Sequence, residues 1–413
     1  MDKDTVIVTI ASATYRPKVQ ALAKSLRRSG ISASFHWVCL EKLGADSDIA
    51  SLRYCDAIKY AGDVVQDFQW RSLKYDVVEL GTSIKPDVLL QLLEEGWQHV
   101  IYLDPDMWIT APMEEVTASL GTADVLLTPH WIRPSEATVI EPADVSRVGI
   151  YNLGFIAVSN TENAKNCLTW WSSQTCTGCT RSQERGIFVD QRWADHFSAL
   201  FERVAILRDA RYNVAWWNMI GRSSVDATLY HFSGYDPVAH PKLTRHVTGM
   251  TISMISAIHA DAVDRYRQAL ALEHSDKLHA LAVESERHAM HRDVPYLLRL
   301  YARESNEQVA REDLLEPGES VLRWLVFRLR KIAIRDYEEA QSGKNRLDLM
   351  EWLSRPEVES LLESAALHRR VVEFARSEKS SPITKLSSIE PVRATVPLWE
   401  RCECGAPKPG RFG

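Results

Sequence analysis

The segment IYLDPDMWI, residues 101–109, places two carboxylates one residue apart directly after an apolar run. The run before Asp104 is typical of a buried strand, and Pro105 forces a turn between Asp104 and Asp106. Mg²⁺ and Mn²⁺ prefer oxygen ligands, and proteins usually hold them with one or two carboxylates together with substrate phosphates. The pair therefore predicts a divalent-metal site at which a diphosphate binds.

A third metal ligand has to come from elsewhere in the chain, and His231 is the best candidate. It follows the strand-like run ATLY at residues 227–230. A histidine at the end of a strand can reach the same edge of a sheet as carboxylates that follow another strand. We therefore expect His231 to join Asp104 and Asp106.

The beginning of the chain suggests a nucleotide pocket. A β-branched run at residues 5–10 leads through a polar loop into helical periodicity that ends at Gly30. Ligands of such α/β sheets bind beyond the carboxyl ends of strands, so Ser12, Thr14 and Tyr15 are candidates for lining this pocket. Simple loop capping by Ser and Thr is an equally good interpretation of each residue alone.

Lys85 stands just ahead of a predicted helix that Pro86 begins and Gly96 ends. Positive charge at a helix N-terminus is unfavourable for the helix, so an anion nearby, such as a phosphate, would explain a lysine there. The alternative is a solvated surface lysine.

Two regions follow from the periodicity. Strand-like and helical runs alternate up to about residue 250, which predicts an α/β domain at 1–250. Helical periodicity then dominates, and we expect a helical extension at 251–378 and a flexible tail at 379–413. Residues 320–335 form a basic amphipathic segment that could contact a membrane surface or pack on the protein itself.

Composition excludes several classes of protein. The net charge of -6 argues against a nucleic-acid partner. No secretory signal and no apolar run of roughly 18 residues is visible. The 7 cysteines are typical of reduced thiols, which predicts a cytoplasmic protein. Such a protein could also contact the inner face of the membrane. Cys176, Cys179, Cys402 and Cys404 could alternatively form a zinc site.

Several motifs in order make the first region similar to a known family. The succession IYLDPDMWI, YNLGFIAVSN, FVDQRW, YNVAWWN and HFSGYDP resembles glycosyltransferases of the GT-A fold, closest to family 8 and related bacterial surface-polysaccharide sugar transferases. The resemblance implies a Rossmann-like, mixed and mostly parallel sheet, Mn²⁺ or Mg²⁺ as cofactor, and a nucleotide-sugar donor, most simply a UDP-sugar. It also implies a glycan or lipid-linked acceptor and transfer that retains the anomeric configuration.

The resemblance also assigns roles to individual residues. Asp104 and Asp106 would bind the metal with His231, and Asp104 the donor as well. Asp190 and Gln191 would lie near the reacting carbon. The remaining donor-binding residues would be Tyr15, Lys85, Asn152, Gly154 and Gly234, together with Ser12, which its place after the first strand suggests. The family's lysine after the late His-x-x-Gly motif has no counterpart here, and Lys242 or Arg245 would have to supply that charge.

Two other functions fit parts of the pattern. Phosphohydrolases of the haloacid dehalogenase type also carry Asp-x-Asp after an apolar strand, but they have Thr or Val where this chain has Trp108. A non-catalytic sugar-binding or partner-binding protein on the same fold is the third interpretation.

Overall fold

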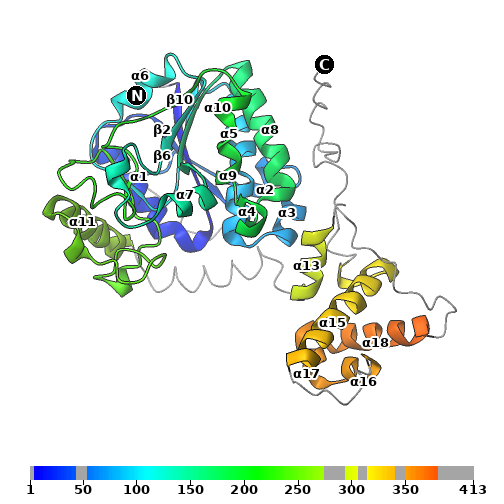
Figure 1. Ribbon diagram of the computed structural model, residues 1–413. Coiled ribbons are helices and arrows are strands. Elements are labelled where there is room, and N and C mark those ends of the chain that lie inside the picture. Colours follow the sequence, from blue (N-terminus) through cyan, green and yellow to red (C-terminus); the bar gives the residue numbers. More distant parts are fainter. Residues whose placement is uncertain (1–3, 43–53, 274–293, 306–313, 340–348, 380–413) are drawn as a thin grey trace. The chain divides into compact units, whose positions relative to one another are not determined.

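The computed structural model describes residues 4–42, 54–273, 294–305, 314–339 and 349–379 (Figure 1). The chain divides into two compact units, the first comprising residues 1–68 and 76–289 and the second residues 69–75 and 290–413. In the first unit α11 (Ala257–Glu273) packs against α1 (Arg16–Arg28). This unit therefore continues past residue 250, where the sequence pattern changes.

A seven-stranded sheet forms the centre of the first unit, with the strand order β10-β6-β7-β4-β1-β2-β3. All neighbouring pairs are parallel except those of β7, which runs antiparallel to both β4 and β6. The strands are β1 (Thr5–Ala11), β2 (Ser34–Cys39), β3 (Ala57–Tyr60), β4 (His99–Leu103), β6 (Val125–Pro129), β7 (Tyr151–Ser159) and β10 (Val204–Ile206).

Burial explains why these runs are so apolar. Every residue of β1 and of β7 is buried, as expected for strands covered on both faces. Helices α5 (Lys85–Glu94) and α8 (Glu162–Gly178) pack together over one face of the sheet, and α1 and α6 (Glu114–Leu120) lie over the other (Figure 1). The predicted fold class, a mixed and mostly parallel α/β sheet followed by a helical region, is confirmed.

A second, three-stranded sheet brings distant parts of the chain together. It has the order β11-β12-β5 and consists of β11 (Val214–Ala215), β12 (Leu229–His231) and β5 (Met107–Ile109). β12 runs antiparallel to β5, with His231 opposite Met107. Since Asp106 directly precedes β5, this register carries His231 to the Asp-x-Asp turn.

Short elements complete the first unit. The helices are α2 (Ala61–Val64), α4 (Val77–Ser83), α7 (Pro142–Val148), α9 (Gln191–Ala194) and α10 (Phe197–Leu200), and a hairpin joins β8 (Arg181–Ser182) and β9 (Ile187–Phe188). Single 3-10 turns are η1 (Ala13–Tyr15), η3 (Pro134–Glu136), η4 (Gln183–Arg185), η5 (Pro237–Ala239) and η6 (Ile252–Met254).

The second unit is helical and has a core of its own. Its helices are α3 (Phe68–Lys74, of which residues 69–74 belong to this unit), α13 (Tyr296–Glu304), α15 (Glu319–Glu339), α16 (Leu349–Leu353), α17 (Pro356–Leu362) and α18 (Ala365–Lys379). Leu322, Leu325 and Leu329 of α15 are buried in this core. Packing thus occupies part of the apolar face of segment 320–335, whose contact with a membrane stays a prediction.

Two earlier expectations extend beyond the described residues. Residues 380–413 of the predicted tail, including Cys402 and Cys404, lie outside them, so the zinc site stays untested. The described thiols of the first pair have separate partners, since Cys176 Sγ donates to Asp67 at 3.3 Å and Cys179 Sγ lies 3.3 Å from Thr82 Oγ1. In the described parts of the chain, no helix has both the length and the apolar character needed to cross a membrane.

Candidate functional site

Asp104, Asp106 and His231 form a compact cluster at the end of β4. One ligand atom from each lies within 4.8 Å of the others. His231 Nε2 lies 3.3 Å from Asp106 Oδ1 and 3.7 Å from Asp104 Oδ2. The backbone fixes the arrangement, because Met107 N–H donates to the Asp104 carbonyl and Phe232 N–H donates to the Asp106 carbonyl. We call these three residues the acidic cluster.

The hydrogen bonds that Nδ1 of His231 makes determine which ring nitrogen carries the proton. The other nitrogen, Nε2, faces the carboxylates. Nδ1 lies 3.0 Å from Asn152 Oδ1 and 3.3 Å from Asn213 Oδ1, and both atoms are acceptors. Nδ1 must therefore carry the proton, so that Nε2 of the neutral ring could offer its lone pair to a metal ion. Two carboxylates and one oriented imidazole form a donor set that could hold a divalent metal ion.

Asn152 and Gly154 were expected beside a donor sugar, and the structure places both against His231. A Cβ on Gly154 would lie 2.5 Å from His231 Cε1, so only glycine leaves room for the ring. The Gly154 carbonyl also accepts from Asp104 N–H at 2.8 Å. These two residues thus build the acidic cluster, and their contact with a sugar stays a prediction.

Lys85 and Asp190 form a sealed ion pair beneath the cluster. Lys85 Nζ lies 2.6 Å from Asp190 Oδ2 and donates to the Leu153 carbonyl at 2.8 Å. Both side chains are almost completely buried, at 1% and 3% exposure. Burial raises the pKa of Asp190, although Lys85 opposes that change. The anion that the position of Lys85 indicated is, in this structure, a carboxylate of the protein.

Tyr102 links this buried pair to the acidic cluster. Its ring lies under the Lys85 ammonium, 4.3 Å from Nζ, and its hydroxyl donates to Asp104 Oδ1 at 2.7 Å. Burial and the neighbouring Asp104 carboxylate raise the pKa of Tyr102, so the hydroxyl keeps its proton as a donor. Tyr102 therefore orients one carboxylate of the cluster.

The side chain of Gln191 also makes hydrogen bonds to other groups of the protein in this structure. Its Nε2 donates to the Val148 carbonyl at 2.8 Å, and its Oε1 accepts from Leu153 N–H at 3.2 Å and Asn152 Nδ2 at 3.3 Å. Like Asp190, it lies near the acidic cluster but is held by the protein. A role of either residue at a reacting carbon remains a prediction.

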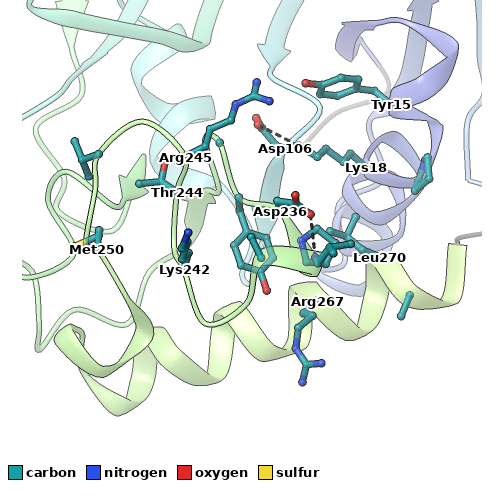
Figure 2. Close-up of a pocket in the computed structure, with 18 of the residues that line it drawn as sticks. Tyr15, Lys18, Asp106, Asp236, Lys242, Thr244, Arg245, Met250, Arg267 and Leu270 are labelled. Atoms are coloured by element: carbon teal, nitrogen blue, oxygen red, sulfur yellow. Dashed lines mark hydrogen bonds and ion pairs between the residues drawn. The ribbon is translucent and has the colours of Figure 1, made fainter. Parts of the chain in front are cut away.

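Asp106 also lines a large pocket (Figure 2). Its volume is about 970 Å³. Tyr15 and Lys18 line it from the start of α1, while Gly234, Lys242 and Arg245 line it from the loop after β12. Of the early residues proposed for a nucleotide pocket, Thr14 and Tyr15 line this one, whereas Ser12 is buried and its Oγ lies 2.6 Å from Thr14 Oγ1.

Lys18 is a site residue that motif reading missed. Its Nζ lies 3.7 Å from Asp106 Oδ2 and 4.7 Å from the centre of the Tyr15 ring (Figure 2). Burial alone would raise the pKa of Asp106, but the Lys18 ammonium is the strongest of the opposing influences that hold this pKa below its ordinary value. One sequence signal was available, because the first turn of α1 has Lys18 and no acidic residue.

Comparison with known proteins gives distant similarities. No family model matches the chain. Two uncharacterized proteins of Bacillus subtilis (strain 168) are similar, YfnD at 26% identity over 37% of this chain and YfnF at 25% over 39%. The chain spans about half the length of these curated relatives, 52% and 58%.

Comparison with solved structures also gives distant similarities. The galactosyltransferase LgtC, in complex with donor and acceptor sugar analogs, matches with a TM-score of 0.44 at 13% identity, over 65% of this chain and 95% of that one. The glycosyltransferase GlyE of Streptococcus pneumoniae TIGR4 matches with a TM-score of 0.40 at 11% identity, over 65% and 63%. At such TM-scores, function has to be inferred from the chain's own side chains.

Proposed function

We propose that this protein is a metal-dependent glycosyltransferase that moves a sugar from a nucleotide-diphosphate sugar, most simply a UDP-sugar, to a glycan or lipid-linked acceptor. One observation carries the proposal: Asp106 belongs both to the acidic cluster and to the lining of a pocket of about 970 Å³. A pocket of that size suits a nucleotide. The ordered motifs that resemble family 8 of the glycosyltransferases support the same conclusion.

Charge explains what each part of the site would do. Breaking the anomeric C–O bond leaves a nucleoside diphosphate with additional negative charge. When bound, a divalent ion supplies Lewis-acid stabilisation of that charge, and Asp104, Asp106 and His231 would hold it. Lys242 and Arg245 line the pocket and would supply fixed positive charge to the leaving group in place of the family's missing lysine.

The buried parts of the site hold the geometry. Tyr102 orients Asp104, and Asn152 keeps the Nδ1 proton of His231 in place. Pre-positioned ligands of this kind need no rearrangement during the reaction. Asp190 would act on the sugar only together with Lys85, because the two side chains are paired. Retention of configuration and a cytoplasmic location remain parts of this proposal that the resemblance and composition motivate.

A thermal-shift screen of nucleotide sugars, with and without Mn²⁺, tests the proposal. A ligand that binds only the native state raises stability by RT ln(1 + [L]/Kd), so the right donor raises Tm in the presence of Mn²⁺. Donor hydrolysis with Mn²⁺ and no acceptor would separate an enzyme from a non-catalytic binding protein. Turnover of p-nitrophenyl phosphate without any response to nucleotide sugars would instead favour a phosphohydrolase.

The phosphohydrolase remains the second candidate because it uses the same Asp-x-Asp turn. The position at which those enzymes have Thr or Val is Trp108, which is 5% exposed and packs edge-on to Tyr266 of α11 with ring centroids 5.8 Å apart. A side chain that fills the core cannot bind a phosphoryl group at the site. The geometry therefore favours the transferase.

A further inference from the structure

Lys18 occupies a position that helix stability alone does not explain. It lies in the first turn of α1, where the helix dipole favours negative charge, and that turn contains no acidic side chain. Two contacts explain its position: the Lys18 Nζ lies over the Tyr15 ring, and it lies 3.7 Å from Asp106 Oδ2. The lysine is therefore placed for the site rather than for the helix.

The ion pair with Asp106 is loose. A separation of 3.7 Å is too long for a hydrogen bond, although it is short enough for charge attraction. In the described part of the chain, the Lys18 ammonium has no hydrogen-bond acceptor, and it lines the pocket with 18% of its side chain exposed. Its three N–H donors are thus available to a ligand in that pocket (Figure 2).

A divalent ion held by Asp106 would share that carboxylate with the ammonium of Lys18. Two cations beside one carboxylate repel each other, so Lys18 weakens binding of the metal alone. A diphosphate in the pocket reverses this effect, because it offers negative oxygens to both cations. Metal and diphosphate then bind more tightly together than either does alone.

We propose that Lys18 couples metal binding to nucleotide binding, by opposing the metal alone and by binding the diphosphate once the metal is present. This inference rests on the proposed function, since it takes a nucleoside diphosphate as the ligand. It assigns to one side chain two effects of opposite sign. A residue with a merely structural role would change both affinities in the same direction.

Calorimetry on the full-length chain tests this with Lys18→Met, which keeps the length of the side chain and removes its charge. We expect Mn²⁺ alone to bind about threefold more tightly to the variant, and UDP in the presence of Mn²⁺ to bind about tenfold more weakly. Lys18→Arg should keep the coupling of the wild type. Arg28→Met removes one positive charge from the exposed last turn of the same helix and should change neither affinity.

The outcomes separate the inference from the function. If no nucleoside diphosphate binds the wild type with Mn²⁺, the proposed function fails and the inference fails with it. If UDP binds the wild type but Lys18→Met binds Mn²⁺ no more tightly, or binds UDP as well as the wild type does, only the inference is overturned. Tm values of all variants within a few degrees of the wild type would show that folding is not the cause.

Discussion

Two lysine–carboxylate pairs flank the same site and differ in nearly every physical respect. Lys85 and Asp190 lie 2.6 Å apart with 1% and 3% of their side chains exposed, whereas Lys18 and Asp106 lie 3.7 Å apart with 18% and 14% exposed. The first pair has no access to ligand in this arrangement. The second borders a pocket. One side of the site is thus fixed by burial, and the other is open to exchange of partners.

The largest expected effect comes from breaking the sealed pair. Lys85→Met leaves the Asp190 carboxylate buried without its cation, and we expect a loss of about 3–5 kcal/mol in the free energy of unfolding. Urea denaturation measures it. Lys59→Met, which breaks an exposed pair with Glu95, should cost less than about 1 kcal/mol. Equal losses for the two variants would remove the distinction between sealed and open pairs.

A buried histidine, His130, whose Nε2 lies 3.5 Å from Asn152 Nδ2, should also make stability depend on pH. Burial lowers the pKa of His130 from 6.5 to about 4, so the folded protein holds this ring neutral. At this ring the unfolded chain binds more protons between these values, so the contribution of His130 to stability falls as pH decreases from 6.5 towards 4. The loss should reach about 3 kcal/mol. Urea unfolding across this range should show a shallower dependence for His130→Gln, whereas exposed His196→Gln should follow the wild type.

On the open side, metal affinity is the sensitive quantity. Asp106→Asn keeps the shape of the side chain but removes one charged ligand, and we expect Mn²⁺ affinity to fall by roughly a hundredfold and donor turnover to fall with it. Calorimetry and a donor hydrolysis assay measure the two. Undiminished donor turnover in this variant would contradict a metal-dependent reaction at the acidic cluster.

A smaller effect on metal affinity should come from Asn152, which contacts both Gln191 and His231. Asn152→Ala removes the acceptor 3.0 Å from His231 Nδ1, while Asn213 Oδ1 at 3.3 Å remains. We expect about a tenfold loss of Mn²⁺ affinity, at the lower end for groups that orient a metal ligand. Asn152→Asp keeps an acceptor and should retain more affinity. Nitrogen-15 NMR of His231 would show whether the proton leaves Nδ1 in the alanine variant.

Sequence reasoning could predict the acidic cluster because its signals are local. An apolar strand followed by Asp-x-Asp, and a strand that ends in His231, place three candidate metal ligands at the ends of strands. Positions that depend on tertiary packing were harder to predict from the sequence. The charge at Lys85 suggested a phosphate nearby, whereas its partner in the structure is the carboxylate of Asp190, which belongs to another part of the chain and which no local pattern could identify.

The same limit applies to the architecture. Alternating strand and helix patterns predicted the α/β class, yet periodicity cannot reveal that residues 69–75 belong with the C-terminal helices, where Leu73 joins their core. Nor can it show that α11 completes the first unit, since the stacking of Tyr266 on Phe232, with ring centroids 4.4 Å apart, is a tertiary contact. Lys18 was missed because only the pairing of β5 with β12 and the packing of α1 define its surroundings.

The antiparallel pairing of β5 with β12 also has a consequence for how the protein matures. The two aspartates leave the ribosome long before His231 does, and closing the chain between them carries an entropic cost that only the completed fold offsets. A nascent chain that ends before β12 holds only part of the site. If the acidic cluster binds Mn²⁺ as proposed, tight Mn²⁺ binding would report the pairing of β12 with β5, and it would serve as a probe of a folding event that secondary structure does not reveal.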